Sequence, residues 1–352
     1  MSSINIDTLI RPNIRGLIAY SSARSEYTGN DAIYLDANEN GLGSALSEGY
    51  NRYPDPLQLQ LKKAIAGIKG IDEQRQFLGN GSDEPIDLLI RSFCNPGKDS
   101  ILVFPPTYGM YEVSARINDV FVKEVLLSKD FQIDADKALS QADENTKIIF
   151  ICSPNNPTGN MIDKTSIITL LERFKGIVVV DEAYIDFVQG QSLLKELGNY
   201  NNIVILQTFS KAWGLAGLRL GMAFASKEIV SILNKVKAPY NINLATQMLA
   251  LEALRSTAFL SQSIQNITDE RKRLETIIAQ LPFVEKIYPS CVNFILLKVL
   301  DAADLYNYLK RRNIIVRNRS NMPLCENCLR VTIGNAEENN LLITALNEYA
   351  NV

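Results

Sequence analysis

The 352-residue sequence contains no histidine. That absence excludes the Ser-His-Asp triad, the Cys-His dyad, every histidine-ligated zinc or iron site and acid–base catalysis by imidazole. If the protein is an enzyme, lysine, tyrosine, carboxylates or a cofactor must move its protons. A basic excess is also lacking, because 36 Lys and Arg stand against 39 Asp and Glu. The charge balance therefore predicts neither a nucleic-acid partner nor binding to an anionic membrane surface.

Long apolar runs are scarce as well. The longest uninterrupted one is Ile148–Cys152, far shorter than the roughly 20 residues that span a bilayer. The first residues show no basic segment followed by an apolar one, as a secretion signal would. The 5 cysteines are an odd set scattered along the chain, which favours reduced thiols and a cytoplasmic protein.

Only one close cysteine pair occurs, the C-x-x-C segment Cys325–Cys328. A zinc site needs four ligands, and the sequence offers neither a second pair nor a histidine. A thioredoxin-like redox motif is equally unsupported, because the pair does not open a helix in the predicted pattern. We interpret the two residues as free thiols in a loop and predict no metal site.

From about Gln76 onward, short β-rich runs alternate with helical stretches, which is typical of parallel βαβ units. Most of the runs are continuously apolar, as in strands covered on both faces. The predicted strands are Ile101–Phe104, Val120–Leu127, Lys147–Cys152, Ile177–Val180, Ile203–Thr208 and Leu220–Ala225. The predicted helices between them are Asp83–Cys94, Tyr108–Ile117, Asp163–Phe174 and Lys227–Val236.

The rhythm changes after Pro239. A long helical region, Leu244–Leu281, precedes three predicted strands and two predicted helices, which are Asn293–Lys298, Ile314–Val316, Leu329–Ile333, Ala302–Arg312 and Glu337–Tyr349. We therefore predict an α/β protein with a large domain (46–239) built on a mostly parallel central sheet and a smaller α+β domain (240–352). Residues 1–45 are expected to form an N-terminal arm and part of the small domain, packed there or on a partner chain.

Ligands of open parallel sheets bind beyond the carboxyl ends of the strands. One such end is Gly79–Glu84, where two glycines allow close approach and Ser82 can cap the following helix. Free N–H groups at the positive end of a helix suit a phosphate, although an ordinary capped turn has the same composition. The sequence has no G-x-G-x-x-G motif, so a dinucleotide site of the Rossmann type is not supported.

Three further strand ends carry chemically capable side chains. Ser153–Gly159 is a proline-rich loop with two amides, and Asp181 ends a buried strand. A carboxylate at that depth needs a cation or a strong donor, or it takes up a proton. Lys211 follows the next buried strand in a glycine-rich turn, with Arg219 eight residues further on. A desolvated lysine suits Schiff-base chemistry, and three such ends together predict one ligand site.

Together, the segments S-P-N-N-P-T-G, D-E-A-Y and S-K-x-x-G-L-x-G-L-R-x-G resemble the fold-type I, class I/II aminotransferases, which use pyridoxal 5′-phosphate (PLP). Within that family the sequence is most similar to the histidinol-phosphate aminotransferases, with further matches at Leu35–Asn40, Arg52–Pro56, Gly79–Glu84 and Leu329–Gly334. The resemblance runs from about Arg11 to the C-terminus. It implies transamination between histidinol phosphate and 2-oxoglutarate in histidine biosynthesis, by a homodimer with shared active sites.

The resemblance also implies roles for single residues. Lys211 would bind the cofactor covalently and, once released, move a proton. Asp181 would pair with the ring nitrogen, Tyr108 would stack on the ring, and Tyr184 and Asn156 would hydrogen-bond its phenolic oxygen.

The remaining assignments concern the cofactor phosphate and the substrate. Gly81, Ser82, Asp83, Ser210, Arg219 and, from the neighbouring subunit, Tyr53 would hold the phosphate. Arg330 would bind the carboxylate of the amino donor and the substrate phosphate in the other half-reaction, with Arg317, Tyr20 and Asn38 lining the rest of that pocket.

Other functions stay open at this point. A PLP-dependent decarboxylase of the threonine-phosphate type or an aromatic amino acid aminotransferase would share these motifs. A sugar-nucleotide or NAD-dependent enzyme would lack the lysine motif. A regulator with an aminotransferase-like domain would need a DNA-binding module ahead of it, for which the forty-odd N-terminal residues are too few.

Overall fold

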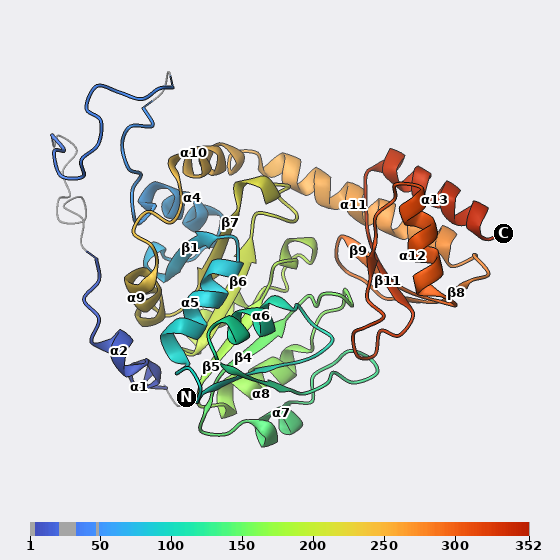
Figure 1. The fold of residues 1–352 in the computed structure, drawn as a ribbon, viewed down its shortest axis with the longest axis horizontal. Helices are drawn as coiled ribbons and strands as arrows, with labels where there is room; N and C mark the ends of the chain where they lie inside the picture. The colour runs from blue at the N-terminus through green and yellow to red at the C-terminus, as the bar shows by residue number, and fades with distance from the viewer. Residues whose placement is uncertain (1–3, 21–32, 47–48, 352) are drawn as a thin grey trace.

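The computed structural model describes residues 4–20, 33–46 and 49–351, and a seven-stranded sheet forms its centre (Figure 1). The strand order is β1-β7-β6-β5-β4-β2-β3. Strands β2 to β6 pair in parallel, whereas β7 is antiparallel to both of its neighbours. The strands are β1 Gln76–Asn80, β2 Ser100–Val103, β3 Phe121–Glu124, β4 Thr146–Cys152, β5 Ile177–Asp181, β6 Ile203–Thr208 and β7 Leu220–Phe224. This confirms the predicted, mostly parallel central sheet.

Helices cover both faces of this sheet because alternate residues of its apolar strands point to opposite sides. In β5, Val178 and Val180 belong to one core cluster, and Ile177 and Val179 to the other. The first face is covered by α4 Leu59–Lys69, α7 Ala135–Gln141, α8 Lys164–Arg173 and α10 Leu244–Ala253. The second is covered by α1 Ile6–Leu9, α5 Asp83–Phe93, α6 Met110–Ile117 and α9 Lys227–Val236.

Short helices complete this part of the chain. They are α2 Pro12–Arg15 and the 3-10 turns η1 Glu73–Arg75, η2 Ile185–Phe187, η3 Leu193–Gly198 and η4 Ala216–Leu218.

A second, four-stranded antiparallel sheet has the order β10-β11-β9-β8 and its own apolar core. Helix α11, drawn in orange in Figure 1, leads from the large sheet to this smaller one. The elements are α11 Thr257–Ile278, β8 Val284–Tyr288, β9 Phe294–Val299, α12 Ala302–Arg311, β10 Arg317–Asn318, β11 Cys328–Thr332 and α13 Ala336–Tyr349. The large and small parts agree with the predicted fold class.

The domain limits predicted at residues 45 and 239 stay a prediction. Ile6 lies in the core on the α5 and α9 side of the large sheet, and Ala250 and Leu254 lie in its other core. None of the helices in the described part of the chain combines the length and apolar character needed to cross a bilayer.

Several elements differ from the predicted ranges. The predicted helix Leu244–Leu281 is two helices, because α10 ends at its C-cap Leu254 before α11 begins. The strand expected at Ile314–Val316 lies at β10, where Arg317 pairs with Arg330. Strand β8 and helices α4 and α7 were not predicted, and only the carboxyl end of β1, at Gly79–Glu84, was expected. In β8 the exposed and half-buried residues give little hydrophobic signal.

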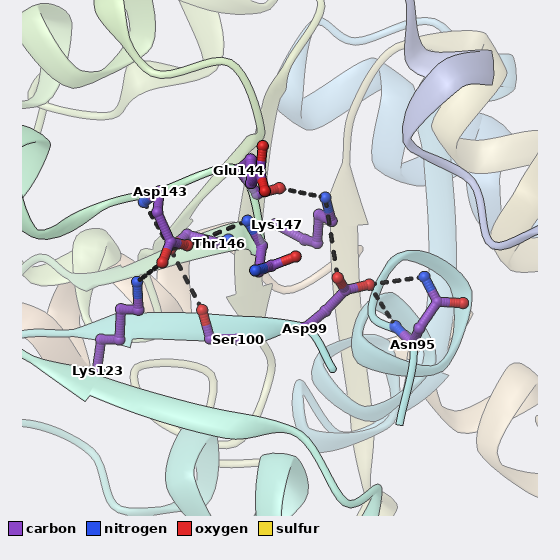
Figure 2. A network of polar contacts seen from close by, with 9 residues as sticks. Asn95, Asp99, Ser100, Lys123, Asp143, Glu144, Thr146 and Lys147 are labelled. Carbon is purple, nitrogen blue, oxygen red and sulfur yellow. Dashed lines mark hydrogen bonds and ion pairs between the residues drawn. The ribbon is translucent and has the colours of Figure 1, made fainter. Parts of the chain in front are cut away.

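A polar network fixes the amino ends of β2 and β4 (Figure 2). Asp99 is fully buried and accepts hydrogen bonds from the backbone and side chain of Asn95 at 2.6 and 2.7 Å. Its other oxygen faces Nζ of Lys147 at 3.9 Å. Nearby, Lys123 pairs with Asp143 at 2.7 Å and lowers the pKa of that carboxyl to about 2. Because the strands are parallel, this network lies at the end of the sheet opposite Lys211.

Candidate active site

A cavity of about 290 Å³ lies at the carboxyl ends of the central strands, next to the small sheet. Most of the residues predicted from the motifs line it. They are Gly81, Ser82, Asp83, Tyr108, Asn156, Asp181, Tyr184, Ser210, Lys211, Arg219, Arg317 and Arg330. The strand ends that the sequence marked as chemically capable therefore meet in one place, as parallel strands require.

Asp181 forms the floor of this cavity. Its side chain is buried, and its two oxygens accept from the Tyr111 hydroxyl at 2.7 Å and the Ala183 backbone N–H at 3.0 Å. Burial raises the pKa of Asp181 to about 6, although these donors and Lys211 partly counteract the shift. The carboxyl is thus poised to ionise fully beside an incoming cation.

Lys211 follows β6 and projects into the same cavity. Its ammonium lies 5.5 Å from the centre of the Tyr184 ring. Burial, followed by the charge of Arg330, lowers the pKa of Lys211, while Asp181 and Asp83 act in the opposite direction. A lower pKa increases the fraction of neutral amine, which is the nucleophilic form.

The turn from β1 into α5 forms a cradle for an anion. Gly81 has a φ of +70°, and a Cβ built there would lie 2.6 Å from the Arg219 guanidinium. Its N–H donates to the Arg219 carbonyl at 2.7 Å. The Arg219 side chain pairs with Asp83 at 3.3 Å, and the Thr208 hydroxyl donates to the Ser210 hydroxyl at 3.0 Å. Amides, hydroxyls and an arginine at a helix N-terminus fit a phosphate group.

Three arginines reach the cavity from the small sheet. Arg330, on β11, donates a hydrogen bond to Oδ1 of Asn156 and lies over the ring of Phe294 at 5.2 Å. Burial lowers the pKa of both Arg330 and Arg319, and each receives further repulsion from its arginine neighbours. The pairing of β10 with β11 sets Arg317 beside Arg330. So much positive charge at one wall fits an anionic substrate.

Two tyrosines form the sides of the site. Tyr184 is buried and packs edge-on against Phe294, at 5.2 Å between ring centres. Tyr108 donates to Oδ1 of Asp83 at 3.0 Å and meets Tyr111 edge-on at 5.6 Å. Its ring therefore stands beside the cradle and near Asp181.

The structure does not bring three predicted residues into this cavity. Tyr53 and Asn38 line a second cavity of about 460 Å³, where Tyr53 stacks on Tyr240 at 4.5 Å. Tyr20 is 73% exposed and lines neither cavity. Their roles stay predictions, and that of Tyr53 involves a second subunit.

Comparison with known proteins supplies the family. The model of the class I and II aminotransferases matches residues 25–346. The chain belongs to this family. It is 52% identical over 347 residues to a histidinol-phosphate aminotransferase of Cytophaga hutchinsonii, covering 99% of this chain and 100% of that protein.

Solved structures agree on the fold of this aminotransferase. The histidinol-phosphate aminotransferase of Clostridium acetobutylicum superimposes with a TM-score of 0.79 at 28% identity, covering 86% of this chain and 91% of that one. The enzyme from Sinorhizobium meliloti, solved in complex with pyridoxal-5′-phosphate, gives 0.78 at 22% identity, with 90% of each chain covered.

The cavity of the aminotransferase fits a phosphorylated pyridine cofactor. At Gly81 the absence of a Cβ leaves room for the Arg219 guanidinium beside the N-terminus of α5, where an anion is attracted. Asp181 supplies a buried acceptor for a ring N–H, and Lys211 an amine for a carbonyl. These three features lie in one cavity, so PLP is compatible with the residues present.

Four further residues at this site were not predicted from the sequence: Tyr111, Arg319, Cys152 and Thr208. Cys152 and Thr208 end the strands β4 and β6, so the strand-end rule could have found them. Burial raises the pKa of the Cys152 thiol, which keeps it neutral. Tyr111 and Arg319 carried no comparable signal.

Proposed function

We propose that this chain is a PLP-dependent histidinol-phosphate aminotransferase, which transfers the amino group of histidinol phosphate to 2-oxoglutarate. The observation that carries the proposal is the 52% identity to the enzyme of Cytophaga hutchinsonii across 99% of the chain. The products are imidazole acetol phosphate and glutamate, which places the reaction in histidine biosynthesis.

Lys211 and Asp181 are assigned the central chemistry. PLP, when bound, supplies a conjugated ring that accepts the electron pair of a broken Cα–H bond. Lys211 holds the cofactor covalently and, once released, carries the proton to and from the substrate carbon. Asp181 keeps a proton on the ring nitrogen, because its buried charge is best stabilised by a cation.

The other side chains of the cavity orient the ring. Tyr108 stacks on it, and Tyr184 and Asn156 hydrogen-bond its phenolic oxygen. Gly81 lines the cradle while its N–H stays bonded to the Arg219 carbonyl. The amides of Ser82 and Asp83, the Ser210 hydroxyl and the Arg219 guanidinium bind the phosphate. This set is supported by the position of the cradle at the N-terminus of α5 and by the lining of the cavity.

The arginine wall binds the substrates. Histidinol phosphate carries a phosphate and 2-oxoglutarate two carboxylates, so each half-reaction brings an anion to the same wall. Arg330 forms bidentate hydrogen bonds with these groups, and Arg317 adds a second positive charge. Asn38 and Tyr20 complete this pocket in the assembled enzyme.

The enzyme acts as a homodimer in the cytoplasm. Tyr53, which lines the second cavity, hydrogen-bonds the cofactor phosphate in the active site of the neighbouring subunit. Several large apolar side chains within about twenty residues of Tyr53 in the sequence are exposed, among them Leu35, Leu42 and Leu59, which supports a subunit contact. All five cysteines are unpaired, which fits a reducing compartment.

A side-by-side screen of amine donors with 2-oxoglutarate tests the function. Histidinol phosphate should give glutamate faster than phenylalanine, tyrosine or aspartate. Carbon dioxide release from threonine phosphate, measured in parallel, tests the decarboxylase alternative. Glutamate formation only with aromatic amino acids, or decarboxylation without amino transfer, would refute the proposal.

A further inference from the structure

We infer that Asn241 and Glu84 are positioning residues that link the phosphate cradle of one subunit to the Tyr53 that this subunit lends to its partner. The inference rests on the proposed dimer with shared sites. It gives a role to Asn241, which lies in none of the motifs, and to Glu84, which the motif Gly79–Glu84 contains without a role of its own. It predicts that substitution of either residue weakens the opposite active site.

The first part of the link joins Asn241 to the cradle. Glu84 lies in the first turn of α5, directly after Ser82 and Asp83. Its carboxylate accepts from the Asn80 backbone N–H at 2.5 Å and from Nδ2 of Asn241 at 3.1 and 3.2 Å. The same Nδ2 donates to the Leu78 carbonyl at 2.9 Å, and Nδ2 of Asn80 donates back to the Asn241 carbonyl at 2.5 Å. Asn241 is therefore held at both its side chain and its backbone.

The second part joins the segment around Asn241 to Tyr53. The neighbouring residue Tyr240 stacks on Tyr53 with an interplanar angle of 15°. Three residues earlier, Nζ of Lys237 donates to the carbonyls of Pro56 and Pro239 at 2.8 and 2.9 Å. The segment 237–241 thus contacts the turn that carries Tyr53 at two points, the Tyr53 ring and the Pro56 carbonyl.

Electrostatics and packing keep Glu84 in place. Lys237 is buried, which lowers its pKa to about 8, while the charge of Glu84 acts to raise it. A Cβ at Gly79 would lie 2.8 Å from Pro85 and 3.2 Å from Glu84, so only glycine lets β1 pass this closely. The Glu84 carboxylate is therefore held by β1 and the Asn241 amide, and the positive charge of Lys237 attracts it.

Hybrid dimers test this link through cofactor affinity. Two chains with different tags are co-expressed and purified through both tags, and one carries Lys211→Ala, so that a single site can bind PLP covalently. The absorbance of that one site is followed during titration with PLP. In the first hybrid, one chain carries both Asn241→Ala and Lys211→Ala, and the other chain is wild type. The active site that keeps Lys211 then contains Tyr53 of the doubly substituted chain. We expect an affinity about two- to tenfold weaker, the effect of one or two hydrogen bonds.

The outcomes separate the inference from the proposed function. The link would be overturned by native PLP affinity in that hybrid, if affinity is lost only when Asn241→Ala and the intact Lys211 are on the same chain. Tyr53→Phe placed in the same trans position is the reference. If it too has no effect, the shared site itself fails; if it weakens binding and Asn241→Ala does not, only the link fails.

Two more variants guard against a folding artefact. Glu84→Gln keeps an acceptor oxygen while removing the charge, and it should weaken trans affinity less than Asn241→Ala does. Asn234→Ala is the matched control, because that half-buried amide donates to the Val230 carbonyl within its own helix. Asn234→Ala should leave the PLP affinity native, whether it is on the Lys211→Ala chain or on the chain with intact Lys211. A loss of affinity equal to that of Asn241→Ala would mean general destabilisation and would overturn the link.

Discussion

The Tyr111 hydroxyl donates a 2.7 Å hydrogen bond to Oδ2 of Asp181, and both side chains are buried. The ring of Tyr111 is stacked on Phe150 at 4.8 Å, so the hydroxyl has a fixed direction. With Ala183 bonding the other oxygen, the carboxylate can aim only one way, into the cavity. We therefore expect Tyr111 to act on the cofactor through Asp181.

Tyr111→Phe should keep the stacking and remove the donor. The pKa of Asp181 then rises further, because one of the hydrogen bonds that lower it is lost. We expect PLP affinity and kcat/KM to fall about two- to tenfold at neutral pH, and the acid limb of the kcat/KM profile to move to higher pH. Tyr349→Phe, which removes a 2.8 Å bond to Asp304 on the surface, is the control and should change neither.

Asp181→Asn should abolish most activity while leaving the fold intact, because an amide cannot keep the ring nitrogen protonated. The loss in kcat should reach about 10² to 10⁴ or more. A drop below roughly tenfold would assign Asp181 a structural role only. Circular dichroism and thermal unfolding check that the fold is preserved.

The same residue should set a pH dependence of cofactor binding. Asp181 takes up a proton as the pH falls below about 6, and the neutral carboxyl no longer attracts a pyridinium. PLP affinity of the wild-type apoenzyme should therefore decline below pH 6. Asp181→Asn should bind PLP more weakly at every pH. If its PLP affinity declined below pH 6 just as that of the wild-type protein does, another group would be responsible for the titration.

Much of this site could be predicted because its residues end apolar strands. Asp181 and Lys211 follow buried runs, and a topology of parallel strands places such ends together. Tyr111, in contrast, lies inside α6 with ordinary helical spacing, so that the sequence describes it as a core aromatic. Only the packing of α6 against β4 and β5 turns its hydroxyl toward the carboxylate.

Long-range pairing accounts for the other gaps. Arg319 reaches the cavity because β10 pairs with β11 and its backbone N–H bonds the Cys328 carbonyl at 2.8 Å, a register the local pattern does not specify. Tyr53, Asn38 and Tyr20 were predicted from the family resemblance. A single chain does not bring them to the cavity, and their assignment depends on a second subunit.

Arg319→Gln should weaken substrate binding selectively. It removes a positive charge from the anion-binding wall and leaves the cofactor contacts in place, so we expect kcat/KM for histidinol phosphate to fall about tenfold or more, mostly through KM. PLP affinity should stay native. Arg312→Gln, which breaks an ion pair with Glu348 in the small domain, is the matched control. Equal effects of both variants would contradict a role in substrate binding.

Glu182 should make stability depend on pH. Burial raises its pKa from 4.5 to about 7. Between these two pH values the folded protein keeps a proton on Glu182 that the unfolded chain releases. This contribution to stability is complete below about pH 4.5 and is lost as the pH rises through 7. Tm should therefore decline over that window.

Glu182→Gln should flatten this decline. The carboxylate accepts from Ser192, Leu193 and Gln207, and Gln207 Oε1 is buried with no hydrogen-bond partner among the described residues. Rotating the Gln207 amide would let that oxygen accept from the new side chain, so the fold should tolerate the change. An unchanged slope of Tm with pH would show that Glu182 does not titrate in this range.

The assignment of Lys211 as the residue that binds PLP covalently is tested by identifying the lysine to which the cofactor is attached. Burial lowers the pKa of Lys62 and that of Lys237 to about 8, but neither residue lines the cavity. The holoenzyme is reduced with borohydride and digested, and the pyridoxyl group is located by mass spectrometry. We expect the label on Lys211. In Lys211→Ala, PLP should bind reversibly, borohydride should attach no label, and no turnover should be detected. A label on Lys62, Lys237 or any other lysine, or activity in Lys211→Ala, would contradict this assignment.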